Sequence, residues 1–188
     1  MYYSGIANTE RKAMNSKQPA LKPQDLLIVL KISVLASGFS SFANLGRDLL
    51  ISASEIHAGV QRATTSHLLS KEPEALEVNR AALSEFLLHG VQYAFPAVIG
   101  PVVRGLPTGV SAPPLRNSFA QVDKLPLVWP DPLGEVRGIS LCPLYPTVPA
   151  ACRVDTVLYG LLAVVDALRG GAAREREIAR EKLVEILK

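Results

Sequence analysis

The chain has 188 residues, of which 48% are hydrophobic and 20% are charged, with 20 Lys and Arg residues against 17 Asp and Glu residues. A chain of this length and apolar content can bury a core as one domain or as two small ones, which excludes disorder of the whole chain. The longest nearly apolar stretch, Leu26 to Phe39, is interrupted by Lys31 and is shorter than the roughly 20 residues of a bilayer span, so we expect no membrane segment.

The first 20 residues are polar, rich in Asn, Ser and Lys, and without hydrophobic periodicity, which predicts a disordered arm over residues 1–20. The arm lacks the apolar centre of a secretory leader, so we expect a cytoplasmic protein. Residues 1–22 carry four basic side chains and one acidic one, whereas residues 23–78 carry four and six. The formal net charge of +3 therefore arises in the arm, and no later segment has the strong positive charge that is typical of nucleic-acid binding.

Residues 21–90 are predicted to form three helices, a short hairpin and a fourth helix. Apolar residues recur at helical spacing, and serines or an asparagine stand where helix caps are needed. Gly90 is expected to end the fourth helix. The expected elements are helices at Pro23 to Ser37, at Ser40 or Ser41 to Leu50, and from Ser52 or Ser54 to an end near His67 to Leu69, a stunted hairpin at Ser70 to Val78, and a helix at Arg80 to His89.

The stretch from Phe42 to Ala63 resembles the helix-turn-helix of bacterial winged-helix regulators of the MarR-like type. Gly46 would be the small residue at the close contact of the two helices, and Ser52 would open the second helix. The turn position that is commonly glycine is Leu50, for which a positive φ is costly, so either the turn has another geometry or the first helix continues. The resemblance implies a winged helix-turn-helix domain over residues 21–90, the alternative being an unrelated bundle of short helices.

The same resemblance implies that the second helix presents its N-terminal residues to a DNA major groove. Structural interpretations compete with this one: Ser54 as a helix cap, and His57 and Gln61 as a solvated face. Arg47 and Arg62 could instead form ion pairs with the neighbouring Asp48 and Glu55. The expected hairpin offers phosphate one cation, Lys71, among three glutamates. The candidate DNA-binding residues are Ser52, Ala53, Ser54, His57, Gln61 and Arg62.

Residues 91–150 hold eleven of the fourteen prolines, which excludes long helices and predicts a small β-containing unit. Strands are expected at 91–95, 98–103 and 136–141. The stretches 101–106 and 134–139 are alike, each with an arginine before a glycine, and they could be paired strands or alike by chance. Their arginines, Arg104 and Arg137, are candidates for an anion contact or for structural ion pairs.

Residues 151–188 are predicted to form a helical hairpin, broken at Gly170 and Gly171. Ile178, Leu183, Ile186 and Leu187 share one side of the last helix. Because few other helices are expected to cover them, we interpret the hairpin as a possible dimerisation element.

Neither a metal site nor a catalytic motif is evident. The soft ligands are Cys142, Cys152 and three scattered histidines, so no zinc site is indicated, and two reduced cysteines are favoured over a disulfide. The chain contains no nucleophile elbow, phosphate loop, dinucleotide fingerprint or metalloprotease motif. We therefore expect no cofactor, no metal and no enzymatic activity.

Together these patterns predict an α+β protein in which the winged helix precedes the proline-rich unit and the hairpin. The remainder resembles uncharacterised bacterial winged-helix proteins in Leu88 to Gly90, in the Trp129-Pro-Asp-Pro stretch and in Asp166 to Arg169, which implies a regulator-like organisation. We expect a homodimeric transcriptional regulator that occupies a promoter by binding double-stranded DNA. The alternative is an antitoxin-type or adaptor module whose residues 91–188 bind a partner protein.

Overall fold

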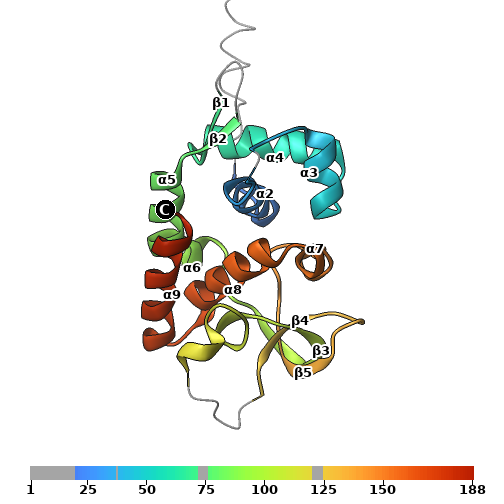
Figure 1. Cartoon of the computed structure of the whole chain (residues 1–188), viewed down its shortest axis with the longest axis vertical. Helices are drawn as coiled ribbons and strands as arrows, with labels where there is room; N and C mark the ends of the chain where they lie inside the picture. Colours follow the sequence, from blue (N-terminus) through green and yellow to red (C-terminus); the bar gives the residue numbers. More distant parts are fainter. Residues whose placement is uncertain (1–19, 37, 72–75, 120–124) are drawn as a thin grey trace, which may run out of the picture.

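The computed structural model describes residues 20–36, 38–71, 76–119 and 125–188 (Figure 1). The protein has the expected mixed α+β composition, with α8 (Thr156–Gly170) at its centre. Three N-terminal helices lie on one side of α8 and a small three-stranded sheet lies on the other (Figure 1). The predicted arm, apart from Ala20, lies outside the described residues.

The N-terminal part follows the predicted order of three helices, a hairpin and a fourth helix. These are α2 (Pro23–Ser33), α3 (Phe42–Leu49), α4 (Ala53–Thr65), the antiparallel strands β1 (Leu69–Lys71) and β2 (Leu76–Val78), and α5 (Arg80–Glu85). Helix α2 ends at Ser33, four residues before the predicted Ser37. The Ser33 carbonyl accepts a hydrogen bond from Arg80 at 3.0 Å. This long-range contact satisfies a carbonyl group that a further helical turn would otherwise satisfy.

The fourth helix does not stop at Gly90, as was predicted. It continues through a π-helical turn, η1 (Phe86–Gly90), into α6 (Val91–Ala94). The strand expected at 91–95 is therefore wrong. Val91 is buried and α6 packs against α8, so tertiary packing outweighs the helix-breaking tendency of Gly90 and the β preference of the apolar run.

The sheet consists of β3 (Ile99–Pro107), β4 (Leu127–Pro130) and β5 (Val136–Leu141), each paired with the other two in a closed barrel. The two similar stretches pair antiparallel, as one of the two interpretations predicted. The sequence did not predict β4, which is a four-residue strand that ends in proline. Its Trp129 is 1% exposed and belongs to the core.

The C-terminal part holds α7 (Val148–Val154), α8 and α9 (Ala173–Ile186), and α8 and α9 form the predicted hairpin. We expected the proline-rich unit to end at residue 150, but α7 begins before that boundary and ends after it. Pro149 does not prevent this helix, because it stands in the first turn, where proline is tolerated. Leu183 and Leu187 are buried, and Ile178 and Ile186 pack against the core. The expectation that the chain cannot cover this side of α9 is therefore wrong, and the argument for a dimer through α9 no longer holds.

One buried polar cluster ties the sheet to the helices. Asp166 of α8 accepts hydrogen bonds from Thr108 at 2.8 Å and from the Trp129 indole at 2.6 Å, and it pairs with Arg169 at 2.6 Å. The Arg169 guanidinium also donates to the carbonyl oxygens of Phe95 and Pro96. Burial raises the pKa of Asp166 more than these partners lower it. Within the described residues, no helix combines the length and apolar character needed to span a membrane.

Candidate nucleic-acid interface

Helices α3 and α4 are joined by a short turn with a left-handed residue. Leu50 has φ 56° and ψ 41°, so the turn takes the left-handed geometry despite the leucine, and both sequence-based alternatives for Leu50 are wrong. The Ile51 N–H donates to the Gly46 carbonyl at 2.9 Å. A Cβ atom on Gly46 would lie 2.5 Å from the Ile51 carbonyl oxygen, so a glycine is needed where the two backbones meet, as was predicted.

The outer face of α4 carries neutral polar side chains. Ile56, Val60 and Ala63 anchor the opposite face in the core. Ser52 caps the helix by accepting from the Glu55 N–H, and its hydroxyl lies 3.1 Å from that of Ser54. The exposed candidates from the sequence are Ser52, Ala53, Ser54, His57 and Gln61.

His57 and Gln61 stand one helical turn apart on this outer face. The His57 ring meets Phe42 of α3 edge to face, with ring centroids 5.2 Å apart. Among the described residues, neither the imidazole nor the Gln61 amide has a hydrogen-bonding partner in the protein. Both side chains are therefore available to an external partner.

Arg62 forms an ion pair, as its structural interpretation predicted, but with a distant carboxylate instead of a neighbouring one. Its guanidinium donates two hydrogen bonds to Asp25, at 2.8 Å and 2.6 Å, and the Asp25 side chain is fully buried. These hydrogen bonds raise the pKa of Arg62 against the lowering effect of burial. The ion pair joins α4 to α2, so we no longer count Arg62 among the DNA-binding candidates.

Most charges near this face are already engaged by other groups of the protein. Lys31 lies between Asp48 and Asp155, at 3.1 Å and 2.8 Å. Burial lowers the pKa of Lys31, but the hydrogen bonds and charges of these carboxylates outweigh it, so the pKa is raised. Glu55 accepts from Gln24 at 2.7 Å. Arg47 of α3 is exposed and donates only to the neutral Asn44, so its charge remains uncompensated among the described ion pairs.

The described chain begins beside α4. Gln24 and Asp25, in the first turn of α2, contact Glu55 and Arg62 on α4. The preceding segment, which carries Arg11, Lys12 and Lys17, lies outside the described residues. The hairpin tip, with Glu72 and Glu74, lies outside the described residues, as do all side-chain details of Lys71.

The other two predicted site residues, Arg104 and Arg137, lie in the sheet. They are register partners on β3 and β5, and both are exposed. The structure therefore brings together the two arginines that the sequence singled out, at the opposite end of the molecule from α4 (Figure 1).

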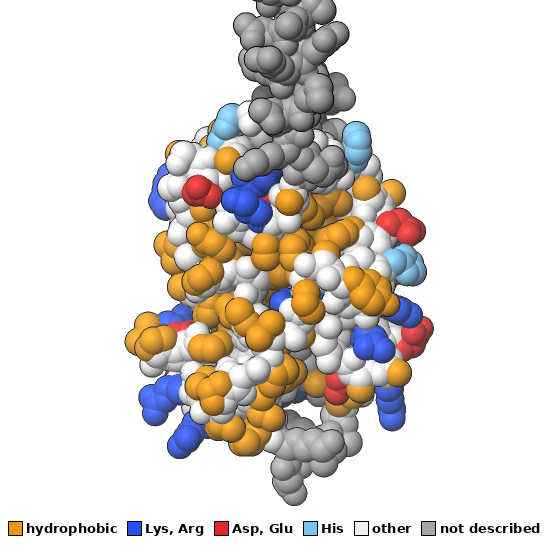
Figure 2. Space-filling view, turned by 180° about the vertical axis from the view of Figure 1, so that it is seen from behind, with side chains coloured by type: hydrophobic (Ala, Val, Ile, Leu, Met, Phe, Trp, Pro, Cys, Tyr) orange, Lys and Arg blue, Asp and Glu red, His pale blue; other side chains and the backbone are white. Residues whose placement is uncertain are grey.

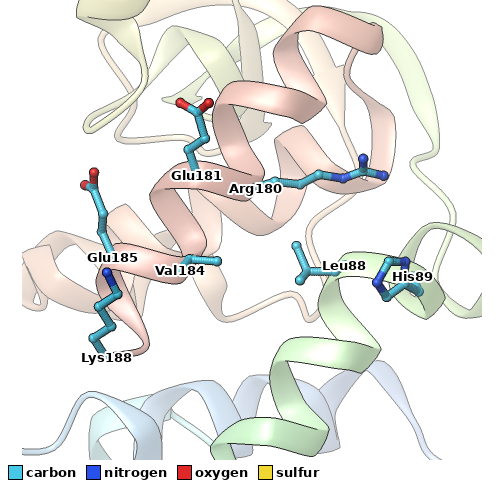
Figure 3. Close-up of a pocket in the computed structure, with 7 residues that line it drawn as sticks. All are labelled: Leu88, His89, Arg180, Glu181, Val184, Glu185 and Lys188. Carbon is cyan, nitrogen blue, oxygen red and sulfur yellow. The ribbon is translucent and has the colours of Figure 1, made fainter.

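A shallow groove of about 560 Å³ separates η1 from α9, a feature that the sequence did not predict. Leu88 and Val184 point toward each other across it, and Arg180 reaches toward His89 (Figure 3). Glu181 and Glu185 point away from this gap. The rim carries charges of both signs and thus defines no single class of ligand.

The cysteines are separate: Cys142 is exposed, Cys152 is buried, and both are free. No group of three or more His, Cys, Asp or Glu side chains in the described ranges is arranged to hold a metal ion. Comparison with protein-family models, with curated proteins and with solved structures finds no match for this chain.

Proposed function

We propose that residues 21–90 form a winged helix-turn-helix domain that binds double-stranded DNA through α4, and that the protein is a transcriptional regulator acting by promoter occupation. The order α2, α3, α4, β1, β2 and α5 is the order expected of such a domain. The Gly46 contact and the left-handed turn at Leu50 support the same interpretation.

The observation that carries the proposal is the outer face of α4. His57 and Gln61 project from a helix whose other face is fixed in the core, and neither side chain forms a hydrogen bond within the described part of the protein. Imidazole and amide groups can both donate and accept hydrogen bonds, which allows them to read base edges in the major groove. Ser54 and Ala53 lie at the N-terminal end of the same face and complete the proposed contact surface.

Phosphate contacts would come from groups around α4 rather than from α4 itself. Arg47 is the uncommitted cation on α3, and the sequence before Lys22 carries three more cations. Few phosphate contacts give weak affinity, because each one releases about one counterion. We therefore include a homodimer in the proposal, formed through a surface other than the covered side of α9.

A protein-binding module of antitoxin or adaptor type is the second candidate. It is favoured by the near-neutral α4 face and by a run of five exposed residues, 98–102, at the start of the sheet. In this run Val98, Ile99 and Val102 are 60%, 55% and 43% exposed. Figure 2 shows apolar side chains over much of this face, including the lower part where the sheet lies. Exposed apolar patches of this kind mark interaction surfaces.

The test is a salt titration of binding to duplex DNA from the region upstream of the coding sequence, with a shuffled duplex for comparison. The variant His57→Ala/Gln61→Ala is expected to lose roughly 1–3 kcal/mol per lost base contact on the upstream duplex and almost nothing on the shuffled one. His89→Ala/Gln92→Ala removes the same side-chain types from η1 and α6 and serves as the matched control.

Deletion of residues 1–20 should act differently from the α4 variant. It removes Arg11, Lys12 and Lys17, so binding should weaken on both duplexes and the salt dependence should flatten by up to about three units. If the wild-type protein shows no preference for the upstream duplex, or if the α4 variant binds as the control variant does, the DNA-binding proposal fails and the protein-binding candidate replaces it.

A further inference from the structure

Arg104 and Arg137 stand directly opposite each other in the antiparallel ladder of β3 and β5. Residues in such register point to the same face of a sheet, with Cβ atoms about 4.5–5.5 Å apart. Both side chains are exposed. Two guanidinium groups therefore project from adjacent positions on one surface.

The glycines that follow these arginines explain why the side chains point outward. A Cβ on Gly105 would lie 2.1 Å from the Trp129 carbonyl oxygen, and one on Gly138 would lie 2.2 Å from the Pro126 carbonyl oxygen. The glycine positions therefore face the closely approaching β4 segment. Since successive residues on a strand point to opposite faces, each preceding arginine faces away from it.

The arginine pair has no evident structural use. Other arginines are paired with carboxylates, namely Arg62 with Asp25, Arg153 with Asp131 and Arg169 with Asp166. In the described part of the chain, neither Arg104 nor Arg137 forms an ion pair. Like charges directly opposite one another destabilise a sheet, so the pair carries a cost that an anion would relieve.

The next register pair on this face is apolar. On one side Val102 stands opposite Ile139, two residues from Arg104 and Arg137, and brings no carboxylate. On the other side Glu135 precedes β5, and within the described residues it forms no ion pair with either arginine. A phosphate group with two negative charges can neutralise both guanidinium groups at once, whereas one carboxylate neutralises only one. We propose that Arg104 and Arg137 together bind a doubly charged phosphate, either inorganic phosphate or the terminal phosphate of a monoester.

This site is independent of the proposed DNA contact. The sheet and α4 lie at opposite ends of the molecule (Figure 1), and lysine or arginine side chains project from the lower end in Figure 2. The two proposals can therefore fail separately.

The test is a titration of the full-length protein with sodium phosphate at pH 7.5 and constant ionic strength, followed by NMR of the backbone amides. We expect saturable shifts in β3 and β5. Arg104→Gln/Arg137→Gln should weaken binding at least tenfold. Arg116→Gln/Arg174→Gln removes two other exposed charges and should change binding less than twofold. Thermal unfolding gives a second measurement: phosphate should raise the Tm of the wild type and of the control, but not that of the site variant.

Competition experiments with further ligands show whether the bound group is free phosphate or the phosphate of a monoester. Competition by a 5′-phosphorylated oligonucleotide, but not by the same oligonucleotide with a 5′-hydroxyl, supports a monoester ligand, while competition by neither supports free phosphate. Equal competition by both oligonucleotides, or glutarate binding as tightly as phosphate, would overturn the proposal. It also fails if the shifts do not saturate or if the two double variants lose affinity equally.

Discussion

The indole Nε1 of Trp129 donates a hydrogen bond to Oδ2 of Asp166 at 2.6 Å, and this contact joins the shortest strand of the barrel to the central helix. Trp129 is 1% exposed and Asp166 is 3% exposed. The ring of Trp129 also packs against Tyr159 of α8, with centroids 5.8 Å apart. A single strand and a single helix thus share an apolar contact and a buried polar one, which fixes how the sheet sits on α8.

We expect Asp166→Ala to destabilise the protein by about 3–5 kcal/mol, because it leaves the buried Arg169 charge and two donors without their acceptor. Thr108→Val removes one donor and leaves the ion pair intact, so its cost should be about 1 kcal/mol. Urea unfolding of both variants measures the difference. Equal costs for the two variants would show that the ion pair is not the centre of this cluster.

Two glycine substitutions, one in the barrel and one in α8, should have opposite effects on stability. A Cβ on Gly105 meets backbone atoms of Trp129, so Gly105→Ala should destabilise the fold by about 2–3 kcal/mol. Gly160 lies within α8, where an added Cβ meets only Pro114 at 3.6 Å. Gly160→Ala should therefore stabilise the protein by about 0.5–1 kcal/mol through helix propensity. Thermal unfolding measures whether each variant is less or more stable than the wild type. A Gly105→Ala variant of unchanged stability would contradict the close approach of β3 to β4.

The N-terminal elements could be predicted because their signals are local. Helical spacing of apolar residues and serine caps at Ser41 and Ser52 depend on neighbours within one or two turns. The predictions failed where distant packing decides the conformation. Gly90 continues a helix because α6 packs on α8, and β4 forms because two strands from elsewhere accept it.

The candidate site shows the same division between local and distant signals. The candidate residues on the outer face of α4 followed from the family resemblance, and the similarity of the two Arg-Gly stretches could be seen in the sequence itself. The partner of Arg62 did not, because Asp25 lies 37 residues earlier in the sequence. Two neighbouring carboxylates, Asp48 and Glu55, were the expected partners of the arginines, but both are engaged by residues of α2.

Leu50 provides a test of the turn itself. Its left-handed backbone is costly for leucine, while its side chain is 57% exposed and loses little burial when removed. Leu50→Gly should therefore stabilise the protein by about 0.5–1 kcal/mol, and Leu50→Val should destabilise it by a similar amount, since a branched Cβ fits this region poorly. Urea unfolding distinguishes the two, and a destabilising Leu50→Gly would mean that the leucine side chain contributes packing that its exposure does not suggest.

The two cysteines should react very differently with a thiol reagent at pH 8. Burial, followed by the nearby Asp155 and Asp166 charges, raises the pKa of Cys152 far above its ordinary value, so almost no thiolate is present. Cys142 is exposed. The folded protein should release one equivalent of chromophore quickly and a second only in denaturant. Cys142→Ser should abolish the fast phase, and its survival in that variant would place Cys152 at the surface.

Arg47 and Arg62 form a matched pair for separating binding from folding. Arg62→Ala leaves the fully buried Asp25 without its partner, so the free energy of unfolding should fall by about 3 kcal/mol. Arg47→Ala removes an exposed cation that donates only to Asn44 and should change stability by less than about 0.5 kcal/mol. If Arg47 contacts one phosphate, its loss should reduce the slope of log affinity against log salt by about one unit on every duplex. Fluorescence anisotropy at four salt concentrations, together with urea unfolding, measures both quantities for each variant. An unchanged slope in Arg47→Ala would remove Arg47 from the proposed interface, and a fully stable Arg62→Ala would return Arg62 to it.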